Sequence, residues 1–438
     1  MSAVHYESWG RYPKHNPAGV IKLFWKDEIP RLDNIEGSVL PYGCGKSYGD
    51  SCQNSGGILL DTRGLNRLIS FDEKEGVLKC EAGVTLSAIL DFAVPRGWFL
   101  AVTPGTKHIT IAGAIANDVH GKNHHRAGSF GCWVNCFELL RSNGERFLCS
   151  NEENPDLFRA TIGGLGITGL ITWVEIRLKP CPSAFFYYES IKFDNLDEFF
   201  LINADSDSEF EYTVSWVDTS ATDGSLGRGI YMRGNHASPD KFKLPDLPKP
   251  KQIPMPIQAP FINSCSVNLF NLLYYHKQFE RKISQVAHYD PFFYPLDAIS
   301  NWNLAYGKNG FLQYQFVVPF GSERDSLKRM LRIIARSGMS SFLTVLKTMG
   351  DKPSPGMMSF PRPGVIMAID FRMTGEPALK LLSTLDEIVV DVGGILYPAK
   401  DARMSARDFQ LFYPQWREFS KFIDPKFSSS FWRRVIGN

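Results

Sequence analysis

The sequence has almost no net charge, no paired cysteine motif and no long apolar run, although it is 438 residues long. Its 48 lysines and arginines are balanced by 46 aspartates and glutamates, which predicts no basic face of the kind that binds nucleic acid. The eight cysteines form no CxxC pair and no Cys/His spacing typical of zinc. We therefore expect no nucleic-acid partner, no metal site, and idle thiols in a reducing compartment.

The sequence also lacks any segment typical of export or membrane insertion. Its first 15 residues, MSAVHYESWGRYPKH, contain no apolar core of a signal peptide. The longest weakly polar run, residues 160–176, is interrupted by four glycines and three threonines, so it does not predict a transmembrane helix. We expect a cytoplasmic protein without a signal peptide or transmembrane segment.

What is present predicts a large α+β protein. Apolar residues make up 44% of the chain and charged residues 21%, enough for a sizeable core in two or three domains. Strands and helices mix without strict βαβ alternation. Thr85 is placed to cap a helix that ends at about residue 93. Short β-branched runs predict strands at 57–61, 77–83 and 167–178.

Residues 184–394 differ from the glycine-rich residues 1–183 by their aromatic clusters and two clear helices. One helix opens at Ser322, with Asp325 in the capping-box position. The other runs over 377–392, and a strand is predicted nearby, at 311–318. We expect this region to form a sheet with helices on one face.

Residues 236–260 contain seven prolines and have no helical or strand period, so they predict a long mobile loop. Two interpretations of this loop stay open. It is either a surface excursion, or a lid over a substrate entrance, because long irregular loops in compact domains are often functional.

The segment PYGCGKSYGD, residues 41–50, nearly matches two phosphate-binding motifs and fits neither. A Walker loop needs glycine where Leu40 stands, and a Rossmann fingerprint needs glycine where Tyr48 stands. What remains is a glycine-rich turn whose backbone N–H groups can bind an anion, or a tight turn with a purely structural role. Segments 104–125 and 161–169 add small residues that let a large flat ligand approach the backbone.

Three histidines in the segment DVHGKNHHRAGSFG invite a metal interpretation. His120, His124 and His125 are spaced HxxxHH, and no carboxylate or cysteine completes a ligand set. The pattern therefore favours a structural or cofactor-facing His120 over a metal ligand.

The three glycine-rich segments, in this order and spacing, resemble the FAD-binding domain of the vanillyl-alcohol oxidase / p-cresol methylhydroxylase superfamily. The stretches GKSYGD, DVHGKNHHRAGSFG, FLQYQF and YPAKDAR resemble the decaprenylphosphoryl-β-D-ribose 2'-oxidase family more closely. The likeness runs from about Tyr6 to Phe427. It implies an FAD-binding domain of residues 1–183 completed by 395–438, and a substrate-binding domain of residues 184–394.

The resemblance also implies where FAD binds. The turn around the pyrophosphate would be formed by Pro41, Tyr42, Gly43, Cys44, Gly45, Lys46, Ser47, Tyr48, Gly49, Asp50 and Ser51. The isoalloxazine and ribityl parts would contact Gly105, Thr110, Ile111, Ala112, Gly113, His120, Gly121, Lys122 and Asn123, with Ile171 at the adenine and Tyr397 returning to the flavin. Many relatives attach FAD covalently through a histidine where this chain has Lys46, so we expect non-covalent FAD.

A second set of residues is implied for substrate and catalysis. Lys400 is the expected general base, with Tyr48 and His120 beside it in the catalytic group. Lys122 and Lys347 are candidates for a substrate phosphate or the flavin, whereas Gln313, Gln315 and Tyr48 would orient sugar hydroxyls. Ala368 stands where the best-known members have a cysteine, and Ile366 replaces an amide, which predicts a more apolar substrate pocket.

The reaction implied is FAD-dependent oxidation of a secondary hydroxyl, at C2 of a polyprenylphosphoryl-β-D-ribose, to the 2-keto sugar. This would be the first half of an epimerisation to arabinose in cell-wall biosynthesis. A short-chain NADH-dependent reductase would complete it, and the lipid-linked substrate implies peripheral contact with the inner membrane. Two alternatives remain: an aldonolactone or alditol oxidase acting on a soluble sugar, and a flavin- or lipid-binding protein without turnover.

Overall fold

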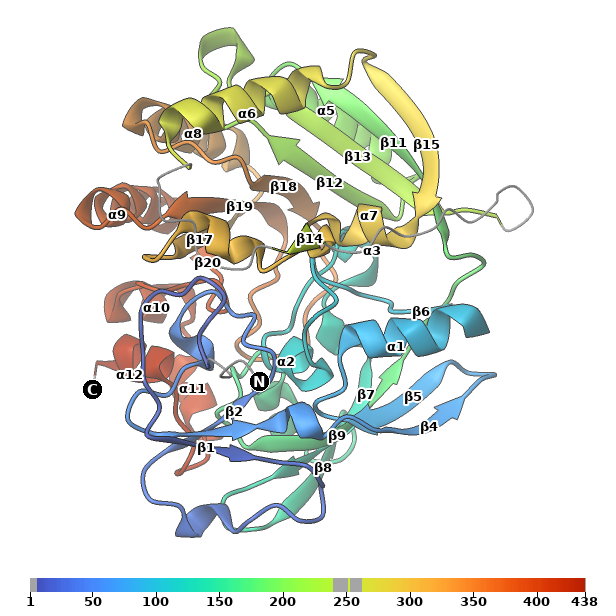
Figure 1. Cartoon of the computed structure of the whole chain (residues 1–438), viewed down its shortest axis with the longest axis vertical. Helices are drawn as coiled ribbons and strands as arrows, with labels where there is room; N and C mark the ends of the chain where they lie inside the picture. The colour runs from blue at the N-terminus through green and yellow to red at the C-terminus, as the bar shows by residue number, and fades with distance from the viewer. Residues whose placement is uncertain (1–5, 239–250, 253–261, 438) are drawn as a thin grey trace.

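The computed structural model describes residues 6–238 and 262–437, and the backbone of residues 251–252. The chain forms two stacked parts, with residues 6–183 and 397–437 below and the residues between them above (Figure 1). Most of the predicted loop at 236–260 lies outside the described residues, so neither interpretation of it is tested.

The lower part contains two sheets. A parallel sheet has the order β1 (Gly19–Lys22), β3 (Ile58–Asp61), β2 (Val39–Tyr42). An antiparallel sheet has the order β4 (Leu68–Asp72), β5 (Val77–Glu81), β9 (Leu170–Arg177), β7 (Val134–Leu140), β8 (Arg146–Ser150). The three strands predicted in this region are therefore present, with shorter ends.

Short helices join these sheets, and one small strand pair borders them. The helices are α1 (Leu86–Ala93), α2 (Ile111–Ala116), α3 (His124–Ala127) and α4 (Pro155–Thr161), and the strand pair is β6 (Trp98–Phe99) with β10 (Lys179–Pro180). The predicted cap of α1 is confirmed, because the Thr85 hydroxyl accepts a hydrogen bond from the Ala88 N–H at 3.2 Å. Such a cap satisfies one of the N–H groups left open at a helix start.

The C-terminal helices α10 (Ala406–Phe412), α11 (Trp416–Ser420) and α12 (Ser430–Ile436) return to the lower part (Figure 1). The Val39 N–H donates to the Lys426 carbonyl at 2.8 Å, beside the start of β2. Both ends of the chain therefore build the same half of the molecule.

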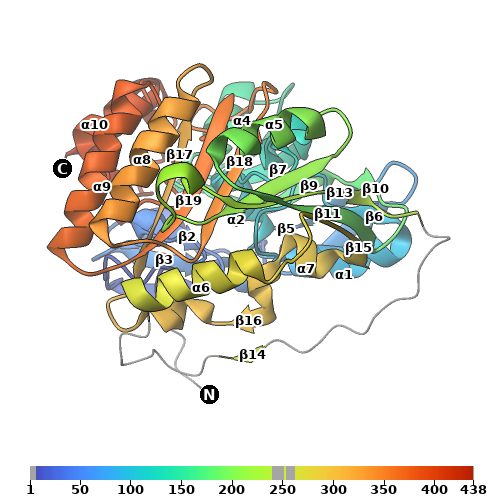
Figure 2. The same cartoon turned by 90° about the horizontal axis from the view of Figure 1, so that it is seen from above.

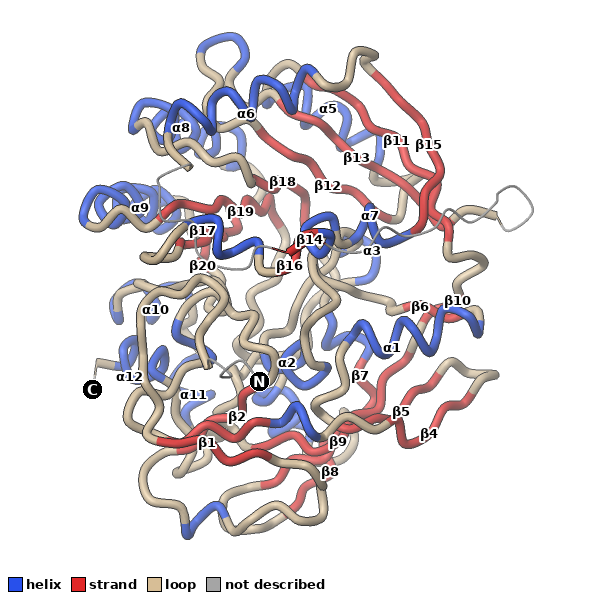
Figure 3. Tube along the Cα trace, in the orientation of Figure 1, coloured by secondary structure: helices blue, strands red, loops and turns tan. Residues whose placement is uncertain are grey.

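The upper part is one eight-stranded sheet, seen as the band of strands in the upper half of Figure 3. Its order is β15 (Lys282–His288), β11 (Phe185–Phe193), β13 (Gly229–His236), β12 (Tyr212–Val217), β18 (Thr344–Met349), β19 (Gly364–Arg372), β17 (Phe311–Val318), β20 (Ile395–Leu396). The predicted strand at 311–318 is confirmed as β17. β20 pairs with β17, so this sheet ends two residues beyond the boundary predicted at 394.

The remaining elements of the upper part are helices and one short strand pair. They are α5 (Leu196–Ser206), α6 (Ser264–His276), α7 (Tyr289–Phe293), α8 (Glu323–Ser337) and α9 (Glu376–Asp391), and β14 (Lys251–Gln252) with β16 (Ile299–Ser300). Both predicted long helices, α8 and α9, are confirmed. The predicted capping box of α8 is wrong: the Ser322 side chain caps nothing, and the Glu323 carboxylate accepts from the Gly321 N–H at 2.5 Å instead.

The expectation that helices cover one face of this sheet is wrong as well. Neighbouring residues of a strand point to opposite faces. On β12, Val217 belongs to the core that α5 and α8 cover, whereas Trp216 packs against Tyr274 of α6, with ring centroids 4.6 Å apart. Figure 2 shows α5 and α6 on opposite sides of these strands.

The same alternation decides which side chains of β17 face the lower part. Tyr314 points towards α9, where its hydroxyl donates to Asp386 at 3.0 Å. Gln313 and Gln315 therefore share the other face, in register with Asp370 and Ala368 of β19. This face looks onto the loops of the lower part.

Candidate active site

A cavity of about 780 Å³ lies between the two parts. Its loop wall belongs to the lower part and consists of segments 41–52, 103–122, 161–171 and 397–400. Its strand wall is the sheet face that carries alternate residues of β12, β18, β19 and β17. Helix α6 and the turns at 293–302 border the remaining side.

Most of the residues expected at FAD or substrate line this cavity. On the loop wall lie Pro41, Gly43, Cys44, Gly45, Lys46, Ser47, Tyr48, Ser51, Gly105, Thr110, Ala112, Gly113, His120, Gly121, Lys122, Ile171, Tyr397 and Lys400. On the strand wall lie Gln313, Gln315, Lys347 and Ala368. The fold thus gathers residues from the beginning, middle and end of the chain.

Five of the residues expected at the cofactor do not line the cavity, because each is held in a structural contact. The Tyr42 hydroxyl donates to the Glu7 carbonyl at 2.8 Å. Ile111 is fully buried in the core of the lower part. The Asn123 amide donates to the Ala101 carbonyl at 2.9 Å, where it holds the loop from behind. The other two, at positions 49 and 50, belong to a joint with the C-terminus.

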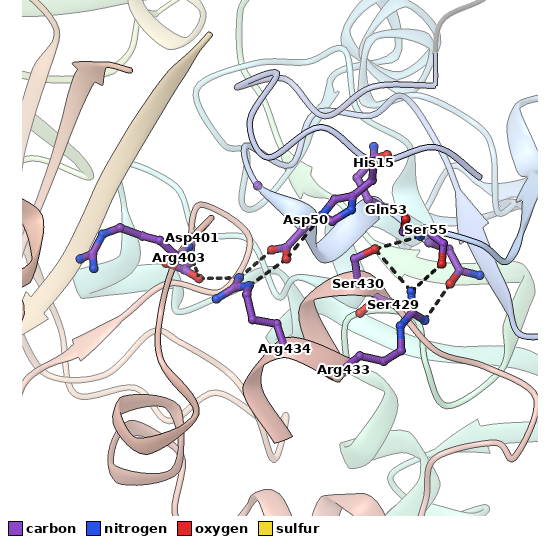
Figure 4. Close-up of polar contacts among 12 residues, drawn as sticks. His15, Asp50, Gln53, Ser55, Asp401, Arg403, Ser429, Ser430, Arg433 and Arg434 are labelled. Atoms are coloured by element: carbon purple, nitrogen blue, oxygen red, sulfur yellow. Dashed lines mark hydrogen bonds and ion pairs between the residues drawn. The ribbon is translucent and has the colours of Figure 1, made fainter. Parts of the chain in front are cut away.

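That joint is an ion-pair network behind the loop wall (Figure 4). Arg434 of α12 donates to both carboxylate oxygens of Asp50, at 2.6 and 2.9 Å, and to Asp401 at 2.9 Å. A Cβ added to Gly49 would lie 1.6 Å from the Asp401 carbonyl oxygen, so only glycine allows this approach. One arginine therefore fastens the glycine-rich turn to the segment that follows Lys400.

The loop wall fits a long cofactor with a pyrophosphate and a flat ring. Gly45 has φ +61°, a left-handed conformation that favours glycine in the turn. A Cβ added to Gly105 would meet no protein atom within 4 Å, so a ligand can come close to the backbone there. The buried Ser51 hydroxyl has no hydrogen-bond partner among the described residues, so a bound ligand can form a hydrogen bond with it.

Lys400 lies where the two walls meet. Its ammonium group is 3.6 Å from the centroid of the Tyr48 ring, and its backbone N–H donates to the Tyr397 carbonyl at 3.0 Å. Burial lowers the pKa of Lys400 to about 7, against an opposing attraction from the Asp370 carboxylate. At neutral pH this amine is thus present in both protonation states, as a general base requires.

Asp370 lies just behind the strand wall and is almost fully buried. The Gln313 amide donates to it at 2.6 Å, and the Tyr306 hydroxyl lies 3.4 Å from its other oxygen. Burial raises the pKa of Asp370 to about 7, while the Gln313 hydrogen bond and the Lys400 charge act in the opposite direction.

His120 is held between two partners. Its Nδ1 lies 2.8 Å from the Lys347 ammonium, and its Nε2 lies 2.8 Å from the Gln315 amide. Burial, followed by the positive charge of Lys347, lowers the pKa of His120 well below its usual value, so the imidazole is neutral. Lys347 also donates to the Gly121 carbonyl, so it ties the strand wall to the loop wall.

Four lysines give the cavity a positive charge. Burial lowers the pKa of Lys122 and of Lys347 to about 7, like that of Lys400, and the pKa of Lys46 to about 8. The Lys46 ammonium lies 3.2 Å from the Trp9 ring centroid. Groups that are costly to charge when buried are stabilised by an anion, so the cavity suits phosphate groups.

The strand wall beyond these lysines is largely apolar. Ile366, Ala368 and Trp216 line it, and Phe293 and Trp302 line the side that borders it. Two buried hydroxyls on it, of Ser215 and Thr344, have no hydrogen-bond partner among the described residues. A polyhydroxylated ligand can satisfy both.

Two other properties bear on cofactors and membranes. Within the described ranges, no three side chains among His, Cys, Asp and Glu are grouped as a metal site would need. All eight cysteines are described, and each is a free thiol. None of the described helices combines the length and apolar character needed to cross a bilayer.

Sequence reasoning missed several residues of this site, among them Asp370, Arg434, Trp9, Ser215 and Thr344. Asp370 could have been found, because it is two positions after Ala368 and alternate strand residues share a face. Arg434 and Trp9 carry no such signal, since they reach the site only through the return of both chain ends to the lower part.

Comparison with known proteins shows which family this chain belongs to. The family of the FAD binding domain matches residues 33–150, which include most of the loop wall. Over 412 residues, the chain is 37% identical to the decaprenylphosphoryl-beta-D-ribose oxidase of Mycolicibacterium smegmatis, which covers 91% of this chain and 89% of that protein. The chain belongs to the decaprenylphosphoryl-β-D-ribose oxidase family.

Two further relatives are consistent with this assignment. An uncharacterized protein of Streptomyces coelicolor, in the mprA 5' region, is 30% identical over 80% of this chain and 100% of its own length. A putative D-arabinono-1,4-lactone oxidase of Neurospora crassa is 35% identical over only 33% of this chain and 26% of its own. The predictions of an α+β flavoprotein, of FAD as cofactor and of an FAD-dependent oxidoreductase are confirmed.

Proposed function

We propose that this oxidoreductase converts a polyprenylphosphoryl-β-D-ribose to its 2-keto sugar, and that Lys400 is the general base. The observation that supports this most strongly is the placement of Lys400 on the cavity wall with a pKa of about 7. When bound, FAD supplies the acceptor for the hydride that leaves the sugar carbon. Neutral Lys400 takes the proton of the hydroxyl group on that carbon. The carbon loses its hydride and the hydroxyl loses its proton, and a carbonyl group forms.

The other polar residues position the sugar and its phosphate in this proposal. His120 is neutral and held by Lys347 and Gln315, so it can exchange hydrogen bonds with a sugar hydroxyl without carrying charge. Lys122 and Lys347 would hold the phosphate, whose negative charge would raise the pKa of both. Gln313 and Tyr48 would orient the ring from either side of Lys400.

The product needs a second enzyme, and the substrate needs a membrane. A 2-keto sugar becomes the epimer only when a hydride returns to the opposite face, which we assign to a short-chain NADH-dependent reductase as partner. The polyprenyl tail of the substrate is membrane-soluble, so we infer peripheral contact with the inner membrane. Both inferences follow from the substrate rather than from a contact seen in the fold.

Anaerobic titration of the yellow holoenzyme tests the proposal. A polyprenylphosphoryl-β-D-ribose should bleach the flavin absorbance, whereas an alditol and an aldonolactone at the same concentration should not. Bleaching by the soluble sugars alone would assign the protein to the lactone and alditol oxidases instead. If no sugar bleaches the flavin, the site binds without turnover.

A further inference from the structure

Helix α6 (Ser264–His276) buries a polar side chain and exposes most of its apolar ones. Three of its side chains are buried, and the middle one is the amide Asn271, between Val267 and Tyr275. Four apolar side chains point outward: Leu269 is 55% exposed, Phe270 44%, Leu272 44% and Leu273 61%. Soluble helices normally turn their leucines inward, so this pattern needs an apolar partner.

The reversed orientation is fixed by buried hydrogen bonds. The Asn271 amide donates to the Asp218 carboxylate at 2.9 Å and to the Ser341 carbonyl at 3.0 Å. The Tyr275 hydroxyl donates to Asp194 at 2.6 Å. If the helix were rotated to bury its leucines, these buried polar groups would lose their hydrogen-bond partners. The leucines therefore stay on the exposed side.

The exposed face is continuous with the cavity. Phe270 and Tyr274 of α6 belong to the cavity lining, as do Ile299 and Trp302 of the adjoining turn. Just beyond the helix, Phe279 is 94% exposed. An apolar chain leaving the cavity at this side therefore passes onto apolar side chains.

The charge of this segment suits a lipid headgroup region. Residues 264–278 contain no aspartate or glutamate, and Lys277 follows the helix directly. The Lys277 ammonium lies 3.5 Å from the Tyr274 ring centroid, at the edge of the apolar face. An apolar face with a lysine at its edge is typical of helices that lie in a membrane interface.

We propose that the exposed face of α6, with Phe279, is a membrane-docking surface that seats the cavity on the bilayer holding the polyprenyl tail. The bilayer contact itself stands on the geometry of α6. The delivery of a lipid-linked sugar to the cavity rests on the proposed function. In that case, α6 is the surface that makes the peripheral membrane contact. A helix lying flat in the interface needs no membrane-spanning segment.

Vesicle flotation of the holoenzyme tests the docking surface. The probe is a vesicle of phosphatidylcholine and phosphatidylglycerol, and the test variant is Leu269→Ser/Leu273→Ser. The control is Leu201→Ser/Leu411→Ser, which removes two leucines that are 64% and 53% exposed on α5 and α10. We expect wild type and control to float, and the α6 variant to bind about tenfold or more weakly.

Equal flotation of the α6 variant and wild type overturns the proposal, and so does a wild type that does not float. If wild type stays with the aqueous phase but self-associates through α6, the face is a protein interface instead. Flavin bleaching separates this proposal from the proposed function. The α6 variant should oxidise a water-soluble short-chain substrate normally and a vesicle-embedded long-chain substrate about tenfold more slowly. A variant that floats poorly while wild type bleaches with no sugar supports the docking surface and rejects the proposed reaction.

Discussion

The two walls of the cavity are built by different physical means. The loop wall is mainly backbone: Gly43 and Gly45 let the turn pack against Thr110 and Tyr42, Gly105 leaves room for a ligand, and Arg434 fixes the turn from behind. The strand wall is made of side chains, presented at fixed spacing by four paired strands. Lys400 and His120 belong to the loop wall and face residues of the sheet.

This difference assigns different tasks to the two walls. Backbone N–H groups bind a constant anion such as a pyrophosphate, and they change little with side-chain substitution. Side chains on strands can be exchanged one at a time without moving the backbone, as Ala368 and Ile366 illustrate. We expect substitutions on the strand wall to alter the substrate and those behind the loop wall to release the cofactor.

The largest effect is expected from Lys400→Ala. Loss of a general base typically slows the chemical step about 10²–10⁴-fold. The variant should keep its FAD, because the glycine-rich turn at 41–51 and its joint with Arg434 are unchanged, and stopped-flow flavin reduction measures the rate. Lys380→Ala, on the exposed side of α9, is the matched control. Near-normal reduction in Lys400→Ala would remove this lysine from the mechanism.

Arg434→Ala should break the loop wall without touching the strand wall. It leaves Asp50 buried without its arginine partner and leaves Asp401 with the backbone N–H groups of Arg403 and Met404 alone, with an expected loss of about 2–3 kcal/mol in the free energy of unfolding. The expected loss is smaller than the loss for a fully buried ion pair, because the Arg434 side chain is 26% exposed. Urea unfolding and the flavin content after gel filtration measure the effect. Arg336→Ala on α8 should change neither, and a fully FAD-loaded, equally stable Arg434→Ala would contradict the role of the joint.

The pH dependence of flavin reduction should report the lowered pKa of Lys400. Below a pH of about 7 the amine is protonated and cannot accept the hydroxyl proton. The rate should therefore fall about tenfold per pH unit below 7 and level off above it. A profile that rises towards acid, or that persists unchanged in Lys400→Ala, would assign the titration to another group.

The smallest effect is expected from Lys46→Ala. Its ammonium lies over the Trp9 ring, and such a contact contributes about 0.5–2 kcal/mol, so the free energy of unfolding measured in urea should fall by that amount or less. Because no histidine stands at this position, acid precipitation of the wild type should release all of its flavin. Flavin that remains with the denatured chain would show a covalent bond.

The glycine-rich segments of the loop wall stand out in the sequence itself, whereas the strand-wall residues were predicted only through the family resemblance, for a physical reason. Glycine-rich turns are local, so the composition of residues 41–50 indicates either an anion-binding turn or a structural one. Tyr42 and Ile111 do not line the cavity, and a motif does not say which of its side chains turn inward. The strand wall depends on the pairing of β17, β18 and β19, which are far apart in the sequence, and the reversed polarity of α6 depends on Asp218 and Ser341.

The most direct test of the central claim is anaerobic flavin reduction with substrate that carries deuterium at one sugar carbon. We expect deuterium at C2 of the polyprenylphosphoryl ribose to slow bleaching, because that C–H bond breaks in the hydride transfer. Deuterium at C3 should leave the rate unchanged. Equal rates for the unlabelled, C2-labelled and C3-labelled substrates would contradict oxidation at C2, and so would slowing by the C3 label alone.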